Sequence, residues 1–146
     1  MKVHLLLIPL VGFLIAADAA KDEAAKKEVQ KLQGAWVMLS YEDDGKLDET
    51  FKDAKQVFEG DKYTVKSGEK LLRKGEFVLD PAQKPAAIDL LPEIGPYKGK
   101  RLLGIYVLDG DSLKTCFADP GKERPKKFAS PAGSDQSQVA YKRAKP

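Results

Sequence analysis

The residues that most often carry acid–base or nucleophilic chemistry are scarce in this 146-residue chain, which has one histidine, His4, and one cysteine, Cys116. Imidazole is the usual base that activates a serine or cysteine nucleophile, and it is a common ligand of zinc and haem. His4 lies in an apolar N-terminal segment that has the features of an export signal. Cleavage of that signal would leave the mature chain without a histidine. We therefore expect a protein that is not an enzyme and has neither a metal site nor a cofactor. Carboxylate or lysine chemistry is the remaining catalytic alternative.

Asp89 interrupts an otherwise apolar stretch, Ala86–Leu91. A buried carboxylate without a partner is costly, and Arg101 and Arg124 are suitable partners because a guanidinium can bind a carboxylate through two hydrogen bonds. Asp89 could then be a general acid or base with a raised pKa, half of a structural salt bridge at the rim of the fold, or a solvated residue that faces outward. A glycosidase would need a second carboxylate facing Asp89, and the sequence does not place one.

Cys116 lies in an alternating segment, Leu113–Phe117. If Leu113, Thr115 and Phe117 share one face of a strand, Cys116 lies on the opposite face. An unpaired thiol in an oxidising compartment could have a redox or covalent role. Alternatively, it is a small buried hydrophobic residue, which the N-terminal helix could cover.

Residues 1–19 predict a signal peptide, which leaves residues 20–146 as one domain. Lys2 is followed by an apolar stretch, Leu5–Ala17, and then by the small-residue pattern Ala17-Asp18-Ala19. A membrane anchor is the alternative, but this stretch of about 13 residues is shorter than the roughly 20 that cross a bilayer. We therefore expect an exported protein, periplasmic or extracellular, whose mature chain starts close to Ala20.

Hydrophobic periodicity predicts one short helix and a series of short strands. Ala25, Val29 and Leu32 recur at helical spacing within Asp22–Gln33, and Gly34 can end that helix. After Gly34, runs rich in β-branched and aromatic residues are separated by glycine, aspartate and proline. These runs predict strands near Ala35–Glu42, Gln56–Glu59, Lys62–Lys66, Leu71–Leu79, Ala86–Leu90, Leu102–Leu108, Ser112–Ala118, Lys126–Ser130 and Gln138–Arg143.

Many short strands with tight turns and little helix predict a mainly β protein, either a small antiparallel β-barrel of about eight strands or a sandwich. We favour the barrel, because closing the sheet removes the two exposed edges that a secreted monomer would have to protect. Asp48–Ala54 is too polar for the core, and we expect it to cross one mouth of the barrel as a loop or a short turn of helix.

The segment Leu32-Gln33-Gly34-Ala35-Trp36 places a Gly-x-Trp step on the first strand, directly after the short helix. This step resembles the opening signature of lipocalins. The resemblance implies that a late arginine crosses the closed end of the barrel and stacks on the tryptophan, and Arg143 is the candidate. Such a stack is worth roughly 0.5 to 2 kcal/mol. The alternative is a core Trp36 and an unrelated arginine in solvent.

A longer series of short motifs covers nearly the whole of the expected mature chain. The motifs are Leu32-Gln33-Gly34-x-Trp36, Ile88-Asp89-Leu90, Gly104-Ile105-Tyr106, Leu108-Asp109-Gly110-Asp111-x-Leu113, Cys116 and Arg124-Pro125-x-x-Phe128. In this order they resemble an uncharacterised lipocalin-like domain family of exported proteins, abundant in planctomycete-type bacteria. The resemblance implies the barrel and no particular activity, because a fold does not supply a function.

Charge is nearly balanced along the chain, with 25 lysines and arginines against 22 aspartates and glutamates. This pattern excludes the basic footprint of a nucleic-acid-binding protein. Residues 119–146 carry an excess of positive charge, which could attract an acidic polysaccharide or a membrane surface, or could simply be a solvated face and tail. We expect a monomer with no nucleic-acid partner and no stable membrane anchor.

Together these observations predict an exported, non-catalytic binding module whose barrel holds a small apolar or amphipathic molecule. The bulky residues expected near the lumen are Met38, Phe58, Tyr63, Tyr106 and Phe117. The alternative is a filled barrel that acts as a protein- or polysaccharide-interaction module in the cell envelope. A cavity of roughly 300 Å³ or more favours the first function, and an exposed apolar patch on a filled barrel favours the second.

Overall fold

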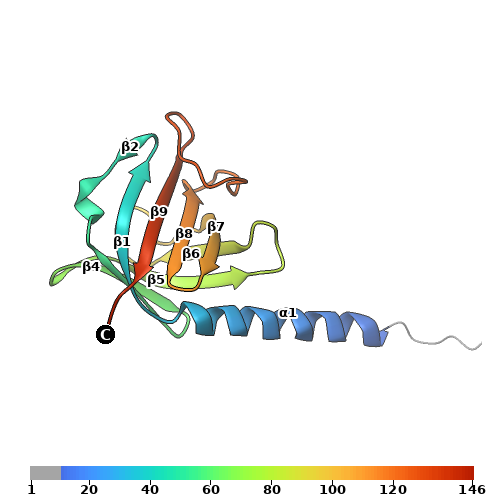
Figure 1. Cartoon of the computed structure of the whole chain (residues 1–146). Coiled ribbons are helices and arrows are strands. Elements are labelled where there is room, and N and C mark those ends of the chain that lie inside the picture. Colours follow the sequence, from blue (N-terminus) through green and yellow to red (C-terminus); the bar gives the residue numbers. More distant parts are fainter. Residues whose placement is uncertain (1–10) are drawn as a thin grey trace, which may run out of the picture.

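A computed structural model describes residues 11–146, with side chains from residue 18 onward (Figure 1). His4 and the first part of the predicted signal peptide therefore lie outside the described residues. This part of the chain is mainly β, with an N-terminal helix, α1 (Val11–Leu32), and a short 3-10 helix, η1 (Glu49–Phe51). The strands are β1 (Gly34–Asp43), β2 (Lys46–Leu47), β3 (Lys55–Glu59), β4 (Lys62–Ser67), β5 (Lys70–Asp80), β6 (Ala87–Pro92), β7 (Leu102–Asp109), β8 (Ser112–Ala118) and β9 (Gln136–Arg143).

The sheet closes on itself and confirms the predicted barrel. Strands β1 and β3 to β9 pair in antiparallel order, and β9 returns to pair with β1. In this closing pair Trp36 lies opposite Arg143 and Tyr41 lies opposite Val139. The two-residue strand β2 extends from β1 outside this ring of eight strands. Closure leaves the eight strands of the ring without a free edge.

Alternating side chains fill the interior of the barrel. On β3 the buried residues are Gln56 and Phe58, and on β4 they are Tyr63 and Val65. Successive side chains of a strand point to opposite faces, so each pair with one residue between its members faces the core. The core also contains Trp36 and other large apolar residues, among them Leu32, Met38, Phe77, Leu79, Ile88, Leu90, Leu102, Tyr106 and Leu113.

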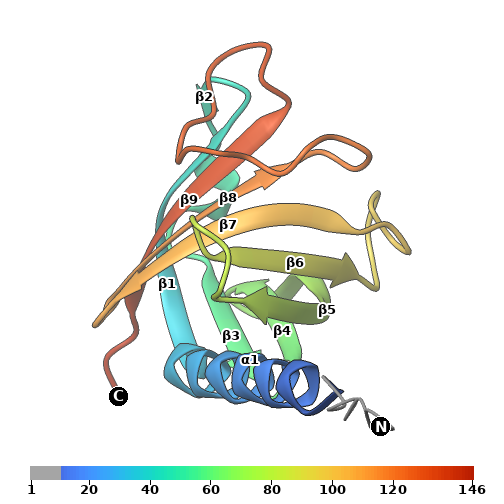
Figure 2. The ribbon, with the colours of Figure 1, turned by 90° about the vertical axis from the view of Figure 1, so that its right-hand side faces the viewer.

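Helix α1 lies across one end of the barrel (Figure 2). Its last turn is held there by side chains of the barrel, because the indole Nε1 of Trp36 donates to the carbonyl oxygen of Leu32 at 2.9 Å. Gln33, just beyond the helix, donates to the carbonyl oxygen of Gly60 and accepts from the Gly60 amide. The Trp36 bond satisfies a carbonyl group that the end of the helix would otherwise leave unpaired, and the Gln33 bonds join this end to the turn between β3 and β4. One end of the barrel is therefore closed, and any entrance must lie elsewhere.

Two of the predicted elements differ in the structure. The helix begins at Val11 rather than Asp22, so the expected cleavage site near Ala19 lies within a continuous helix. The expected strand Lys126–Ser130 is instead part of the connection between β8 and β9, where Pro125 and Pro131 flank it. Proline cannot donate to a β-ladder, and β8 already pairs directly with β9, so no strand position is open to this segment.

Candidate binding site

Two adjoining cavities lie at the end of the barrel opposite α1. The inner cavity measures about 80 Å³ and the outer cavity about 240 Å³. The outer cavity lies between η1, which contributes Phe51, and the connection between β6 and β7, which contributes Ile94 and Pro96. Asp48–Ala54 thus forms a short turn of helix at the mouth, as the sequence predicts. The residues that line both cavities are Tyr63, Arg73, Leu90, Tyr97 and Leu102.

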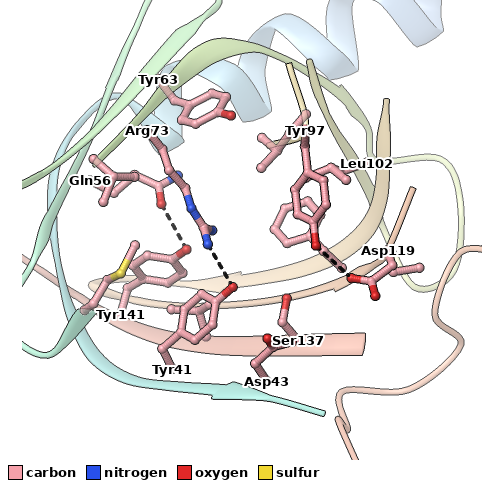
Figure 3. A pocket seen from close by; sticks show the side chains of 16 residues that line it. Tyr41, Asp43, Gln56, Tyr63, Arg73, Tyr97, Leu102, Asp119, Ser137 and Tyr141 are labelled. Atoms are coloured by element: carbon pink, nitrogen blue, oxygen red, sulfur yellow. Dashed lines mark hydrogen bonds between the residues drawn. The ribbon is translucent and has the colours of Figure 1, made fainter. Parts of the chain in front are cut away.

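Polar side chains face the inner cavity from several strands (Figure 3). An Arg73 Nη2 group donates to the hydroxyl oxygen of Tyr41 at 3.1 Å, and the Tyr141 hydroxyl donates to Oε1 of Gln56 at 3.0 Å. In both bonds a buried polar group finds a protein partner, which is how buried polar groups are normally satisfied. The sequence predicts a lumen with bulky apolar and tyrosine side chains, and this end of the barrel also contains a cation and carboxylates.

Arg73 lines both cavities and is a residue that the sequence analysis did not single out. Its guanidinium carbon lies 4.5 Å from the centre of the Phe51 ring and 5.3 Å from the centre of the Tyr41 ring. A signal for it existed, because Arg73 has the same parity on strand β5 as Phe77 and Leu79, both of which face the core. A basic residue on the apolar face of a strand predicts a cation in the interior of the barrel.

Burial alters the ionisation of the groups around the cavities. It raises the pKa of Tyr63 to about 12, and it also raises the pKa of Tyr141. Both hydroxyls therefore stay protonated at neutral pH and remain hydrogen-bond donors. Burial, together with the neighbouring charge of Asp119, raises the pKa of Asp43. The inner cavity thus contains carboxylates as well as the Arg73 cation.

Three of the five expected ligand-binding residues line the inner cavity, namely Met38, Tyr63 and Phe117. Phe117 has room there because its cross-strand neighbour is Gly104, where a Cβ atom would overlap the Phe117 ring. This contact requires glycine for close approach rather than for backbone freedom.

Phe58 and Tyr106 line neither cavity, which corrects the expectation for them. Phe58 packs edge-on against Phe77, with ring centres 5.0 Å apart. The Tyr106 hydroxyl donates to Oε2 of Glu28 on α1 at 3.0 Å. Both residues face the interior as predicted, but they lie at the end that α1 closes. The sequence pattern predicts on which face of a strand a side chain lies, but not where along the barrel axis that side chain is.

Comparisons of this chain with known proteins found no match. No family model, no curated protein and no solved structure was similar to this chain. The lipocalin-like resemblance therefore stays a prediction, and the function must be argued from the side chains themselves.

The expected stack of Arg143 on Trp36 is confirmed. The guanidinium carbon of Arg143 lies 4.3 Å from the centre of the Trp36 ring, and Trp36 is fully buried. Arg143 also donates to the carbonyl oxygens of Lys31 and Gln33, at 2.9 and 3.1 Å, and to a carboxylate oxygen of Asp111 at 3.0 Å. A cation at the end of a helix stabilises its unpaired carbonyl groups. Trp36 and Arg143 therefore attach α1 to the barrel.

The expected pairing of Asp89 with two arginines is also confirmed. One oxygen of Asp89 accepts from Arg124 at 2.6 Å, and the other accepts from Arg101 at 2.7 and 2.8 Å. Arg124 also donates to the carbonyl oxygen of Gly104 at 2.7 Å. Ile88 and Leu90 face the core, so Asp89 faces outward, beneath the connection between β8 and β9. The contacts favour a structural salt bridge over an acid–base role.

Cys116 is buried beneath the same connection and not beneath the N-terminal helix. Its Sγ donates to the carbonyl oxygen of Ala129 at 3.3 Å. Cys116 lies on the outer face of β8, and α1 covers the end of the barrel rather than this face. Burial raises the pKa of the thiol, which keeps it protonated and weakly nucleophilic. These contacts favour the structural alternative for Cys116.

No group of three or more histidine, cysteine, aspartate or glutamate side chains among the described residues could hold a metal ion. No helix in residues 11–146 combines the length and the apolar character needed to cross a membrane.

Proposed function

We propose that this chain is exported and acts as a non-catalytic binding module, which holds a small amphipathic molecule at the open end of its barrel. The observation that carries the proposal is the outer cavity, whose walls are largely apolar and whose base carries a few convergent polar groups. Such a combination is typical of small-molecule sites. Neither cavity alone reaches 300 Å³, so the molecule is small, or only part of it enters the barrel.

The position of α1 supports removal of residues 1–19. The described contacts of α1 with the barrel come from Glu28, Val29, Lys31 and Leu32, whereas residues 18–24 are exposed. Cleavage after Ala19 would therefore leave the helix–barrel contacts in place. Membership of the lipocalin-like family of exported proteins is part of the same proposal.

The intact mass of the protein from its native host tests export. We expect a chain that begins close to Ala20, recovered from the periplasm or the medium. A chain that retains Met1 in the cytoplasmic fraction would contradict export and leave the binding proposal to be judged separately.

A neutral fluorescent probe, N-phenyl-1-naphthylamine, tests binding. We expect saturable fluorescence enhancement with one site per chain, at micromolar affinity or weaker. Burial of about 200 Å² of apolar surface contributes on the order of 5 kcal/mol before the costs of association. Leu72→Trp should abolish the enhancement, because Leu72 lines the outer cavity and a larger side chain would fill it.

Leu71→Trp is the matched control, because Leu71 directly precedes Leu72 on β5 and is 40% exposed. It should bind the probe like the wild type. Equal binding by both variants would show that the probe sits elsewhere on the surface, and no binding by the wild type would contradict a ligand site in the barrel.

One observation favours the alternative, an interaction module. Leu39 and Leu47 are 56% and 67% exposed, and they line the same shallow depression on the outside of the barrel. Exposed apolar side chains that lie together are typical of contact surfaces between proteins. If Leu39→Asp abolishes the fluorescence enhancement of the probe and Leu72→Trp does not, the interaction module becomes the better account.

A further inference from the structure

Arg73 carries a positive charge and forms no ion pair with a described side chain. Its hydrogen-bond partner, the Tyr41 hydroxyl, is uncharged, and the ion pairs of the described residues do not include Arg73. A guanidinium has five N–H donors and stays charged at every physiological pH. Most of its donors thus remain available to a ligand.

The guanidinium stands at the boundary between an apolar and a polar space. In the outer cavity, Leu72, Ile94, Pro96 and Leu102 supply apolar walls, and Arg73 is the one charged residue among the described residues that line it. A ligand that fits this cavity therefore has an apolar body and places its charge at one end, against Arg73.

The sign of that charge follows from the groups around the cavities. Asp43 and Asp119 line the inner cavity but not the outer one. An anion pushed into the inner cavity would meet these carboxylates, whereas an anion on the outer side of Arg73 meets the cation first. Tyr63, which lines both cavities, adds a hydroxyl group to the site.

We propose that the ligand is a small organic carboxylate with an apolar body, held by the Arg73 guanidinium at the base of the outer cavity. This inference rests on the proposed binding function and names the chemical class of its ligand. The guanidinium fork matches the two oxygens of a carboxylate. The outer cavity, at about 240 Å³, lies below the usual 300–1,000 Å³ range of drug-sized sites, which indicates a short aliphatic or a single-ring aromatic acid.

Three probes of equal chain length test the charge preference without any mutation: octanoate, 1-octanol and octylammonium, measured at pH 7 by isothermal titration calorimetry. Octanoate should bind about ten- to a hundredfold more tightly than 1-octanol, as expected for a hydrogen-bonded charge pair, and octylammonium should bind least. 3-Phenylpropanoate in the same series distinguishes an aromatic body from an aliphatic one.

Arg73→Met should remove the preference, so that octanoate binds no better than 1-octanol. Lys74→Met is the matched control, because Lys74 neighbours Arg73 on β5, pairs with Thr64 and makes the same change in charge on the outer face. It should keep the preference. Arg73→Lys should keep part of it, because the charge remains and the fork is lost. Asp119→Asn should tighten octanoate binding, because it removes a nearby negative charge.

The outcomes separate the two proposals. If 1-octanol and octanoate bind equally to the wild type, the carboxylate inference is wrong and the binding module stands. If N-phenyl-1-naphthylamine and all of these probes fail to bind, both are wrong. If Arg73→Met does not fold, the wild-type series and Asp119→Asn still decide the inference.

Discussion

Replacing Trp36 with alanine should lower the free energy of unfolding by about 3 to 5 kcal/mol, as expected for truncation of a large buried aromatic side chain. The indole is fully buried, its Nε1 bonds to the carbonyl oxygen of Leu32, and Arg143 stacks on its face. The change would therefore leave a cavity at the closed end of the barrel and also release the last turn of α1. Urea denaturation should be followed by far-ultraviolet circular dichroism, because Trp36 is the only tryptophan in the chain.

Arg143→Ala is the comparison that separates the two residues. It should cost distinctly less than Trp36→Ala, because the stack contributes roughly 0.5 to 2 kcal/mol and the arginine is partly exposed. Trp36→Phe should fall between the two, since it keeps a ring and loses the Nε1 donor. A cost for Arg143→Ala that equals the cost for Trp36→Ala would show that the helix contacts, and not the packed indole, hold this end together.

Removal of the Asp89 carboxylate should produce the second large loss of stability, about 2 to 3 kcal/mol for Asp89→Ala. Breaking a buried ion pair leaves an uncompensated charge, which costs about 3 to 5 kcal/mol when both groups are fully buried. Here the Arg124 side chain is 23% exposed and the Arg101 side chain 51% exposed, so solvent screening reduces the figure. Denaturation in urea measures the change.

Arg101→Met and the double variant Asp89→Leu/Arg124→Met are the controls. Arg101→Met should cost less than about 1 kcal/mol, because an exposed ion pair contributes little. The double variant should be more stable than Asp89→Ala alone, because no buried charge is left without a partner. If the double variant is the least stable of the set, Asp89 and Arg124 contribute through more than their mutual pairing.

The sequence by itself determined most of the barrel. Strand positions follow from period-two alternation between glycine-containing turns, and these signals are local. The partners of Asp89 could also be named, because few residue types can neutralise a carboxylate in an otherwise apolar strand, whereas the partner of Trp36 came only from the lipocalin resemblance. The one false strand, Lys126–Ser130, has a strand-like composition, but the direct pairing of β8 with β9 leaves no ladder for it.

Only the tertiary structure decided where along the barrel each inward-facing residue lies. Alternation assigns Phe58, Tyr106 and Met38 to the interior alike, yet α1 covers the end that contains the first two, while Met38 lines the inner cavity. The position of Arg73 beside Phe51 depends on η1, which is 22 residues earlier in the chain. Such contacts join segments that are far apart in sequence, so no pattern within either segment predicts them, and the two cavities exist only in the closed barrel.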